Sequence, residues 1–155
     1  MKVLPLTALD TSHQTLLKEA TTRTAHSLNK VSSPQTSVII ATEKSKYYGN
    51  NIFLSNCTLI CAEASALAAA VAANDTKITT LYLSVRRTDG SAPKLISPCG
   101  NCRQMLHDFA HLNGRTIDVC STTSELEKVM VTSSDELLPA GFKSVSLEKF
   151  SQLAS

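Results

Sequence analysis

Two short motifs restrict the folds that are open to this chain. Residues 61–63 read Cys-Ala-Glu and begin an alanine-rich run, and residues 98–102 read Pro-Cys-Gly-Asn-Cys. Cys99 and Cys102 are three residues apart, so on a helix they share one face and can hold the same ion. A proline suits the first turn of that helix, where backbone N–H groups have no partner within the helix. Any fold that uses both motifs must bring them together in space.

The two motifs together predict a catalytic zinc site. Catalytic zinc takes three protein ligands and leaves a fourth position for water, whereas structural zinc uses four protein ligands. The three predicted ligands are thiols, those of Cys61, Cys99 and Cys102. The fourth group nearby is the Glu63 carboxylate, which we expect to carry protons. Three thiolates outweigh Zn²⁺ by one negative charge, and Arg103 is a candidate donor to one of them.

Other uses of a lone Cys-x-x-Cys pair are a redox centre or half of a structural zinc site. The third cysteine and the glutamate disfavour the redox interpretation. A non-catalytic zinc protein, in which the same thiols only stabilise the fold, stays open as an alternative.

Length and composition place the chain among ordinary globular proteins. Its 155 residues suffice for one domain with a hydrophobic core, and no linker or repeat divides residues 1–155. A net charge of +2 without a basic block, and 5% aromatic residues, argue against a nucleic-acid groove. No apolar run predicts a membrane span, and the first ten residues lack the pattern of a signal peptide. Five cysteines, three of them assigned to metal, favour the reducing cytoplasm over a disulfide scaffold.

Hydrophobic periodicity predicts helices that alternate with strands. Helices are expected over residues 11–30 (capped by Thr11 or Ser12), 61–73, 98–113 and 146–154. Strands are expected over residues 37–42, 46–54, 78–85, 116–120 and 128–132, and the first two form a hairpin. This order predicts an α/β fold with three layers, α-β-α, around a mixed five-stranded sheet. In such folds the site lies at one edge of the strands, near helix N-termini.

Several other polar residues have structural interpretations. Cys57 is expected in the core or a cavity wall and not among the ligands. His107 and His111 have a spacing that could bind metal, but without a third ligand a polar helix face is favoured. Arg86 and Arg87 are expected on the rim of a loop, with contact to an anionic substrate as the alternative.

The motifs resemble the cytidine deaminase family. Residues 61–63 followed by residues 97–104 (Ser-Pro-Cys-Gly-Asn-Cys-Arg-Gln) look like its zinc signature. Residues 136–139 (Glu-Leu-Leu-Pro) followed by Phe142 match its C-terminal segment, and residues 49–52 are similar to its substrate-binding strand end. The resemblance covers nearly the whole chain in order.

This resemblance implies a zinc-dependent aminohydrolase that removes the C4 amino group of a free cytosine nucleoside, without an organic cofactor. It implies that Glu63 shuttles the proton between water and substrate. Asn51 would face the sugar, and the Ala62 backbone would face the base. The resemblance also implies a homotetramer, or alternatively a dimer, with one zinc ion in each subunit.

Two departures from the family pattern concern the substrate. Phe53 stands where the family usually has a glutamate that holds the ribose, and no aromatic residue lies between residues 27 and 46 to pack against the pyrimidine. The blasticidin S deaminase branch also has an aromatic in place of that glutamate, and it ends Glu-Leu-Leu-Pro-x-Gly-aromatic. We therefore expect cytidine, deoxycytidine or a blasticidin S-like analogue as substrate, with Phe142 closing over it. A deaminase of another aminated heterocycle is the alternative.

Overall fold

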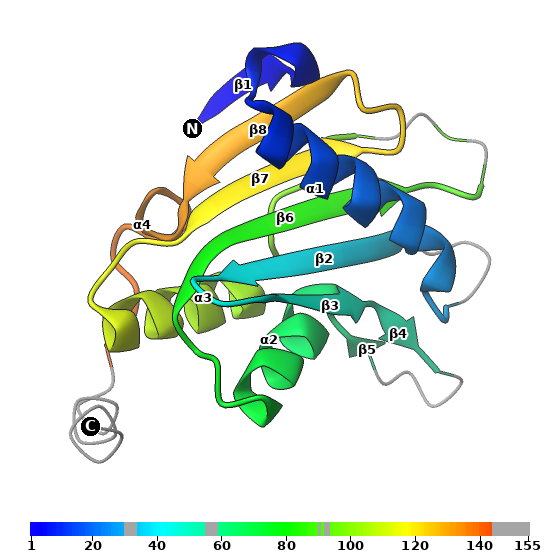
Figure 1. The fold of residues 1–155 in the computed structure, drawn as a ribbon. Helices are drawn as coiled ribbons and strands as arrows, with labels where there is room; N and C mark the ends of the chain where they lie inside the picture. Colours follow the sequence, from blue (N-terminus) through cyan, green and yellow to red (C-terminus); the bar gives the residue numbers. More distant parts are fainter. Residues whose placement is uncertain (30–33, 55–58, 90, 92–93, 144–155) are drawn as a thin grey trace.

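A mixed sheet of six strands forms the centre of the computed structural model, which describes residues 1–29, 34–54, 59–89, 91 and 94–143 (Figure 1). In spatial order the strands are β1 (Lys2–Pro5), β8 (Lys128–Ser133), β7 (Asp118–Thr123), β6 (Ile78–Arg86), β2 (Gln35–Thr42) and β3 (Lys46–Asn50). Strands β6 and β7 are parallel, and every other neighbouring pair is antiparallel. The expected hairpin is β2 and β3.

Helices cover both faces of the sheet, as the sequence predicted (Figure 1). Helix α1 (Thr11–Arg23) lies on one face, and α2 (Ala62–Ala72) and α3 (Gly100–Asn113) lie on the other. Successive residues of a strand point to opposite faces. In β2, Val38 and Ile40 therefore pack beneath α2 and α3, whereas Ile39 packs with Leu17 beneath α1. The three-layer α-β-α architecture is confirmed.

The expectation of five strands was one too few, because β1 was missed. The segment of residues 2–5 is short and ends in a proline, so it shows no clear alternation of apolar and polar residues that would mark a strand. Their pairing partner is β8, with Val3 opposite Met130, far along the chain. Only this distant contact makes the segment a strand.

Helix α1 is shorter than expected and is capped by a different residue. The Asp10 side chain accepts a hydrogen bond from the His13 backbone N–H, so the cap is Asp10 and not Thr11 or Ser12. The helix ends at Arg23 and is followed directly by the 3₁₀ turn η2 (Thr24–His26). A similar turn, η1 (Leu6–Ala8), lies between β1 and the helix. Another short helix, α4 (Ser134–Leu137), follows β8.

The strand expected over residues 46–54 is interrupted at Asn51. Beyond it, β4 (Ile52–Phe53) pairs with β5 (Leu59–Ile60) in a separate two-stranded sheet. At this break the Asn51 backbone N–H donates to the carbonyl of Thr36 in β2, and the Asn51 side chain accepts from the N–H of the same residue. The helix expected over residues 146–154, and Cys57, lie outside the described residues. None of the helices in the described ranges is both long and apolar enough to cross a membrane.

Helix α2 approaches β3 closely at Gly49. A Cβ atom on Gly49 would lie 2.5 Å from the Ala66 nitrogen and 2.9 Å from its Cβ, and closer still to the Ala62 carbonyl oxygen. Ala62 and Ala66 are themselves fully buried. Small residues on both elements therefore set the position of the first turn of α2, which carries the Cys-Ala-Glu motif.

Replacing Gly49 with alanine should destabilise the fold by about 1–3 kcal/mol, the usual cost of inserting atoms into a packed core. The added methyl group meets backbone atoms, which cannot rotate away. Gly100→Ala is the matched control, because a Cβ there meets no atom within 4 Å, and its free energy of unfolding should change by less than about 0.5 kcal/mol. Urea denaturation measures both changes, and equal values for the two variants would contradict this account of the helix position.

Candidate active site

The first two cysteines of the predicted site stand at the N-termini of two helices. Cys61 is the N-cap residue of α2, and Cys99 is the N-cap residue of α3. Cys102 follows in the first turn of α3 and is buried, whereas Cys99 is exposed. The three sulfur atoms lie within 4.8 Å of one another. The fold therefore brings the two distant motifs together, as the sequence predicted.

The distance between two of the sulfur atoms fits a tetrahedral zinc ion. Zn–S bonds are about 2.3 Å long, so two ligands of a tetrahedral centre lie about 3.8 Å apart. The Sγ atoms of Cys61 and Cys99 are 3.8 Å apart. Among the described residues, these three cysteines are the only group of three or more ligating side chains close enough to share an ion. The chain thus presents a zinc site of three thiols with the fourth position left to another ligand.

Without metal, the three thiols have different pKa values. Burial raises the pKa of Cys61 and also that of Cys102, where the Glu63 charge adds to the effect. Burial acts in the same direction on Cys99, but hydrogen bonds from the Cys102 backbone N–H and from neighbouring thiols outweigh it and lower the pKa of Cys99. Zinc binds the thiolate, so loading this site releases protons.

Glu63 lies in the first turn of α2 and is 5% exposed. Burial raises its pKa above the usual value for a glutamate. Burial therefore makes the Glu63 carboxyl easier to protonate than an exposed one, which suits a residue that must both accept and donate a proton. Its neighbour Ala62 is also buried.

A cavity of about 170 Å³ opens beside the thiols and Glu63. It is lined by Thr36, Asn51, Leu59, Cys61, Ala62, Glu63, Ile96, Ser97 and Cys99. Its walls thus combine two of the three thiols with a carboxyl, an amide and two hydroxyl groups. The arrangement can bind a small polar molecule next to a metal ion.

Asn51 lines this cavity but already makes two hydrogen bonds. Its Nδ2 donates to the Pro34 carbonyl at 2.9 Å, and its Oδ1 accepts from the Thr36 N–H at 2.8 Å. A side-chain amide has two donor hydrogens and two acceptor lone pairs. Counting only partners among the described residues, one N–H and one lone pair of Asn51 are left for a ligand.

The two predicted aromatic contacts lie outside the cavity wall. Phe53 pairs with Leu59 across β4 and β5, and of these two Leu59 lines the cavity. Phe142 is 73% exposed. Its backbone is held by Gln104, which donates to the Phe142 carbonyl at 2.8 Å and accepts from its N–H at 3.3 Å. Phe142 is thus fixed in position with its ring in solvent.

Arg103 supports the cysteine motif in a way that the sequence did not predict. Its Nε donates to the Pro98 carbonyl at 2.8 Å, and its Nη2 donates to the Ser97 hydroxyl at 2.6 Å. The guanidinium therefore fixes the turn before Cys99 instead of bonding to a thiolate. Ser121 of β7 adds a hydrogen bond to the Ile96 carbonyl. No pattern around Ser121 signals this role, because the contact exists only in the folded chain.

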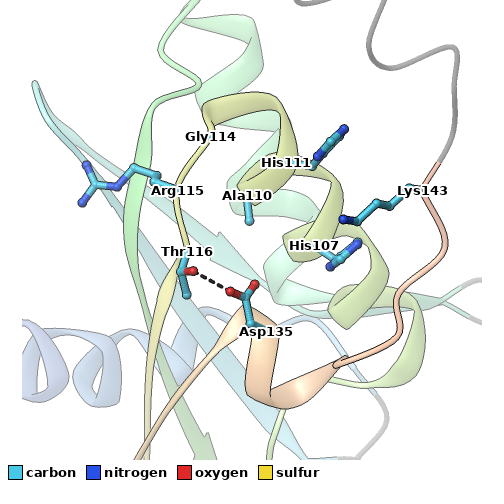
Figure 2. Close-up of a pocket in the computed structure, with 8 residues that line it drawn as sticks. All are labelled: His107, Ala110, His111, Gly114, Arg115, Thr116, Asp135 and Lys143. Atoms are coloured by element: carbon cyan, nitrogen blue, oxygen red, sulfur yellow. Dashed lines mark hydrogen bonds between the residues drawn. The ribbon is translucent and has the colours of Figure 1, made fainter.

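A separate cavity lies at the C-terminal end of α3, where Gly114 ends the helix with φ of 61° (Figure 2). His107 and His111 line it, but both ring nitrogens of His107 are buried without a hydrogen-bond partner among the described residues. The His107 ring also packs against the Gly141 backbone, where a Cβ would come within 2.7 Å of it. His107 is therefore a packed residue and does not belong to the polar helix face that the sequence predicted.

Comparisons with known proteins agree with the geometry of the site. Residues 10–113, which include both cysteine motifs, match the family model described as the cytidine and deoxycytidylate deaminase zinc-binding region. A cytidine deaminase from Mycoplasma genitalium is 34% identical over 107 residues, which cover 68% of this chain and 75% of that protein.

Solved structures show the same fold. A cytidine deaminase from Burkholderia pseudomallei has a TM-score of 0.71 and 25% sequence identity, with 84% of this chain and 98% of that chain covered. A cytidine deaminase from Mycobacterium tuberculosis has a TM-score of 0.66 at 19% identity, with 87% of this chain and all of that chain (100%) covered. The α-β-α layers described above are therefore shared with these proteins.

Purified protein should contain one zinc ion per chain, and Cys99→Ala should remove most of it because two thiols bind zinc more weakly than three. Cys120→Ala is the control, because Cys120 is also a free cysteine but packs in the cluster on the α1 face of the sheet. Elemental analysis after growth with zinc measures both variants. A Cys99→Ala protein that keeps a full equivalent would show that the metal is bound elsewhere.

Proposed function

Since the chain belongs to the cytidine and deoxycytidylate deaminase family, we propose that it hydrolyses the C4 amino group of a free cytosine nucleoside or nucleoside analogue. The observation that carries this proposal is the buried Glu63, which shares one cavity with Cys61 and Cys99. In this proposal Cys61, Cys99 and Cys102 are the metal ligands, and Glu63 is not one of them.

A zinc ion held by the three thiols would supply a water molecule whose pKa falls from about 15.7 toward about 7. Glu63 accepts a proton from the attacking water and passes it to the ring nitrogen next to the amino-bearing carbon. The new C–O bond forms as the double bond between that carbon and the ring nitrogen opens. Glu63 then carries the second water proton to the amino group, and the C–N bond to that group breaks as the carbonyl forms, so that ammonia leaves.

The walls of the cavity orient the substrate. The backbone of Ala62 faces the base, and the free N–H of Asn51 donates to a hydroxyl of the sugar. Ser97 lines the same cavity and offers its hydroxyl to the substrate. Each of these groups is fixed by the fold before substrate arrives: Ala62 by Gly49, Asn51 by Pro34 and Thr36, and Ser97 by Arg103.

Phe53 favours a substrate whose sugar differs from an ordinary ribose. A glutamate at that position would accept a hydrogen bond from the sugar, whereas a phenyl ring cannot accept one and offers only apolar surface. We therefore include blasticidin S-like analogues with cytidine and deoxycytidine as candidate substrates. Phe53 does not line the cavity itself, but Leu59, its partner on the neighbouring strand, does.

A homotetramer, or alternatively a dimer, accounts for the apolar surface near the cavity. Leu59 is 58% exposed and Ile60 41% exposed, although both are large hydrophobic residues. Phe142 is held outside the cavity of its own chain, so in this assembly it closes over the cavity of a neighbouring subunit. The free thiols among the described residues suit the reducing cytoplasm, where we place the protein.

Glu63→Gln should preserve the fold and the zinc content but reduce kcat by at least about 10²–10⁴-fold, because an amide cannot carry the proton. Ammonia release from cytidine, deoxycytidine and blasticidin S, measured alongside metal content, tests this. A wild-type protein that binds zinc yet releases no ammonia from any of the three would support a structural zinc protein. A Glu63→Gln variant with a nearly wild-type rate would remove Glu63 from the mechanism.

Removing the 3′-hydroxyl of the substrate should have little effect, because Phe53 replaces the glutamate that would be left with an unpaired acceptor. The measurement is kcat/KM for cytidine and 2′,3′-dideoxycytidine, with Phe53→Glu as the comparison. The wild-type ratio should stay within about tenfold, and Phe53→Glu should increase the preference for cytidine. A wild-type ratio of several orders of magnitude would show that another residue holds the hydroxyl.

A further inference from the structure

Thr36 contributes its side chain to the wall of the catalytic cavity. It lies near the start of β2, and successive residues of a strand point to opposite faces of the sheet. Val38 and Ile40 pack beneath α2 and α3, so Thr36, which alternates in step with them, faces the same helices. It lines the cavity together with Glu63. The Thr36 side chain therefore points to the metal-binding face of the sheet and not to the face that α1 covers.

The hydroxyl of Thr36 is available to a ligand. Its neighbour across the sheet on β6 is Val85, whose apolar side chain offers no hydrogen bond. No group in the described ranges bonds to the Thr36 hydroxyl, and its oxygen is not buried. A threonine hydroxyl can both donate and accept a hydrogen bond. The cavity wall therefore carries a polar group that the fold itself does not use.

The backbone of Thr36 is held by hydrogen bonds on both sides. Its N–H donates to the Asn51 side-chain oxygen at 2.8 Å. Its carbonyl accepts from the Asn51 backbone N–H at 3.1 Å and from the Ser27 hydroxyl at 3.0 Å. A β-branched side chain also has few rotamers. The hydroxyl is therefore presented to the cavity with little freedom, so a ligand that binds it loses little affinity to side-chain entropy.

The neighbours of Thr36 indicate which part of a cytosine ring it meets. In the proposed function Glu63 serves ring nitrogen N3 and the C4 amino group, and Asn51 serves the sugar on N1. The C2 carbonyl lies between N3 and N1. Thr36 is bonded to Asn51 and shares the cavity with Glu63, so it is suited to reach that carbonyl. Ser97, the other hydroxyl of the wall, lies two residues before Cys99 and so belongs to the metal side.

We propose that the Thr36 hydroxyl donates a hydrogen bond to the C2 carbonyl oxygen of the pyrimidine ring, so that Thr36 helps to select 2-oxo heterocycles. This inference rests on the proposed function, because the orientation of the base is taken from Glu63 and Asn51. A carbonyl oxygen has two lone pairs, so it can accept from Thr36 and from the backbone of Ala62 together. Thr36 touches the substrate but moves no proton, so its loss weakens binding and leaves the chemical step intact.

Two ligands isolate this hydrogen bond. Cytidine carries oxygen at C2, whereas 2-thiocytidine carries sulfur, which is a weaker acceptor. Binding of both is measured by calorimetry on the zinc-loaded Glu63→Gln protein, which holds the ligands without turning them over. In this background Thr36→Val keeps the branched shape of the side chain and removes the hydroxyl, and Thr36→Ser keeps the hydroxyl.

Thr36→Val should weaken cytidine binding by about three- to tenfold, the equivalent of one neutral hydrogen bond, and 2-thiocytidine binding by less than about twofold. Thr36→Ser should keep the preference for cytidine. With Glu63 intact, Thr36→Val should raise KM for cytidine while kcat stays within about twofold of wild type. Thr80→Val is the matched control, because Thr80 is also a threonine of the sheet but does not line the cavity, and both affinities should stay unchanged.

The proposal is overturned if Thr36→Val weakens both ligands equally, as a purely structural role would, or if it weakens neither. It is also overturned if Thr36→Ser loses the preference for cytidine, or if neither ligand binds. Failure of the proposed function would look different: the wild-type protein would release no ammonia from cytidine, while the effect of Thr36→Val on the two affinities would still be measurable.

Discussion

Helix α2 lies so close to β3 that no side chain fits between them at Gly49. This contact fixes the distance of the first turn of α2 from the sheet and its rotation about the helix axis. It thereby fixes the positions of Cys61 and Glu63. The opposite wall is fixed by different means, because Arg103 and Ser121 bind the backbone of the segment before Cys99. The site depends on both, since metal ligands must be placed within a few tenths of an ångström.

The electrostatics of the site follow from this placement. Three thiolates around Zn²⁺ leave one excess negative charge, and Arg103 is engaged elsewhere. Two helix N-termini, each equivalent to about half a positive charge, meet at Cys61 and Cys99 and offset that excess. Burial keeps the pKa of Glu63 raised beside them. The fold thus places the three thiols where zinc can bind them as thiolates, next to a carboxyl group whose burial favours its protonated form.

The sequence was sufficient for features whose cause is local. The cysteine spacing, the alanine-rich helix and the alternation of helices with strands predicted the zinc site and the three layers. It was insufficient where distant contacts decide the structure. Strand β1 exists only because β8 pairs with it, and the strand break at Asn51 depends on bonds to Pro34 and Thr36. Likewise, Arg103 carries a charge suited to a thiolate, but the nearby backbone of Pro98 takes its hydrogen bond.

The central claim is that three thiols of this chain bind zinc and leave one position for water. X-ray absorption at the zinc edge tests it most directly on the purified protein, because it counts ligands by element. The account predicts three sulfur atoms at about 2.3 Å and one lighter atom, oxygen or nitrogen, at about 2.0 Å. Four sulfur atoms would contradict it, since a closed site of that kind has no place for the water that the proposed reaction requires.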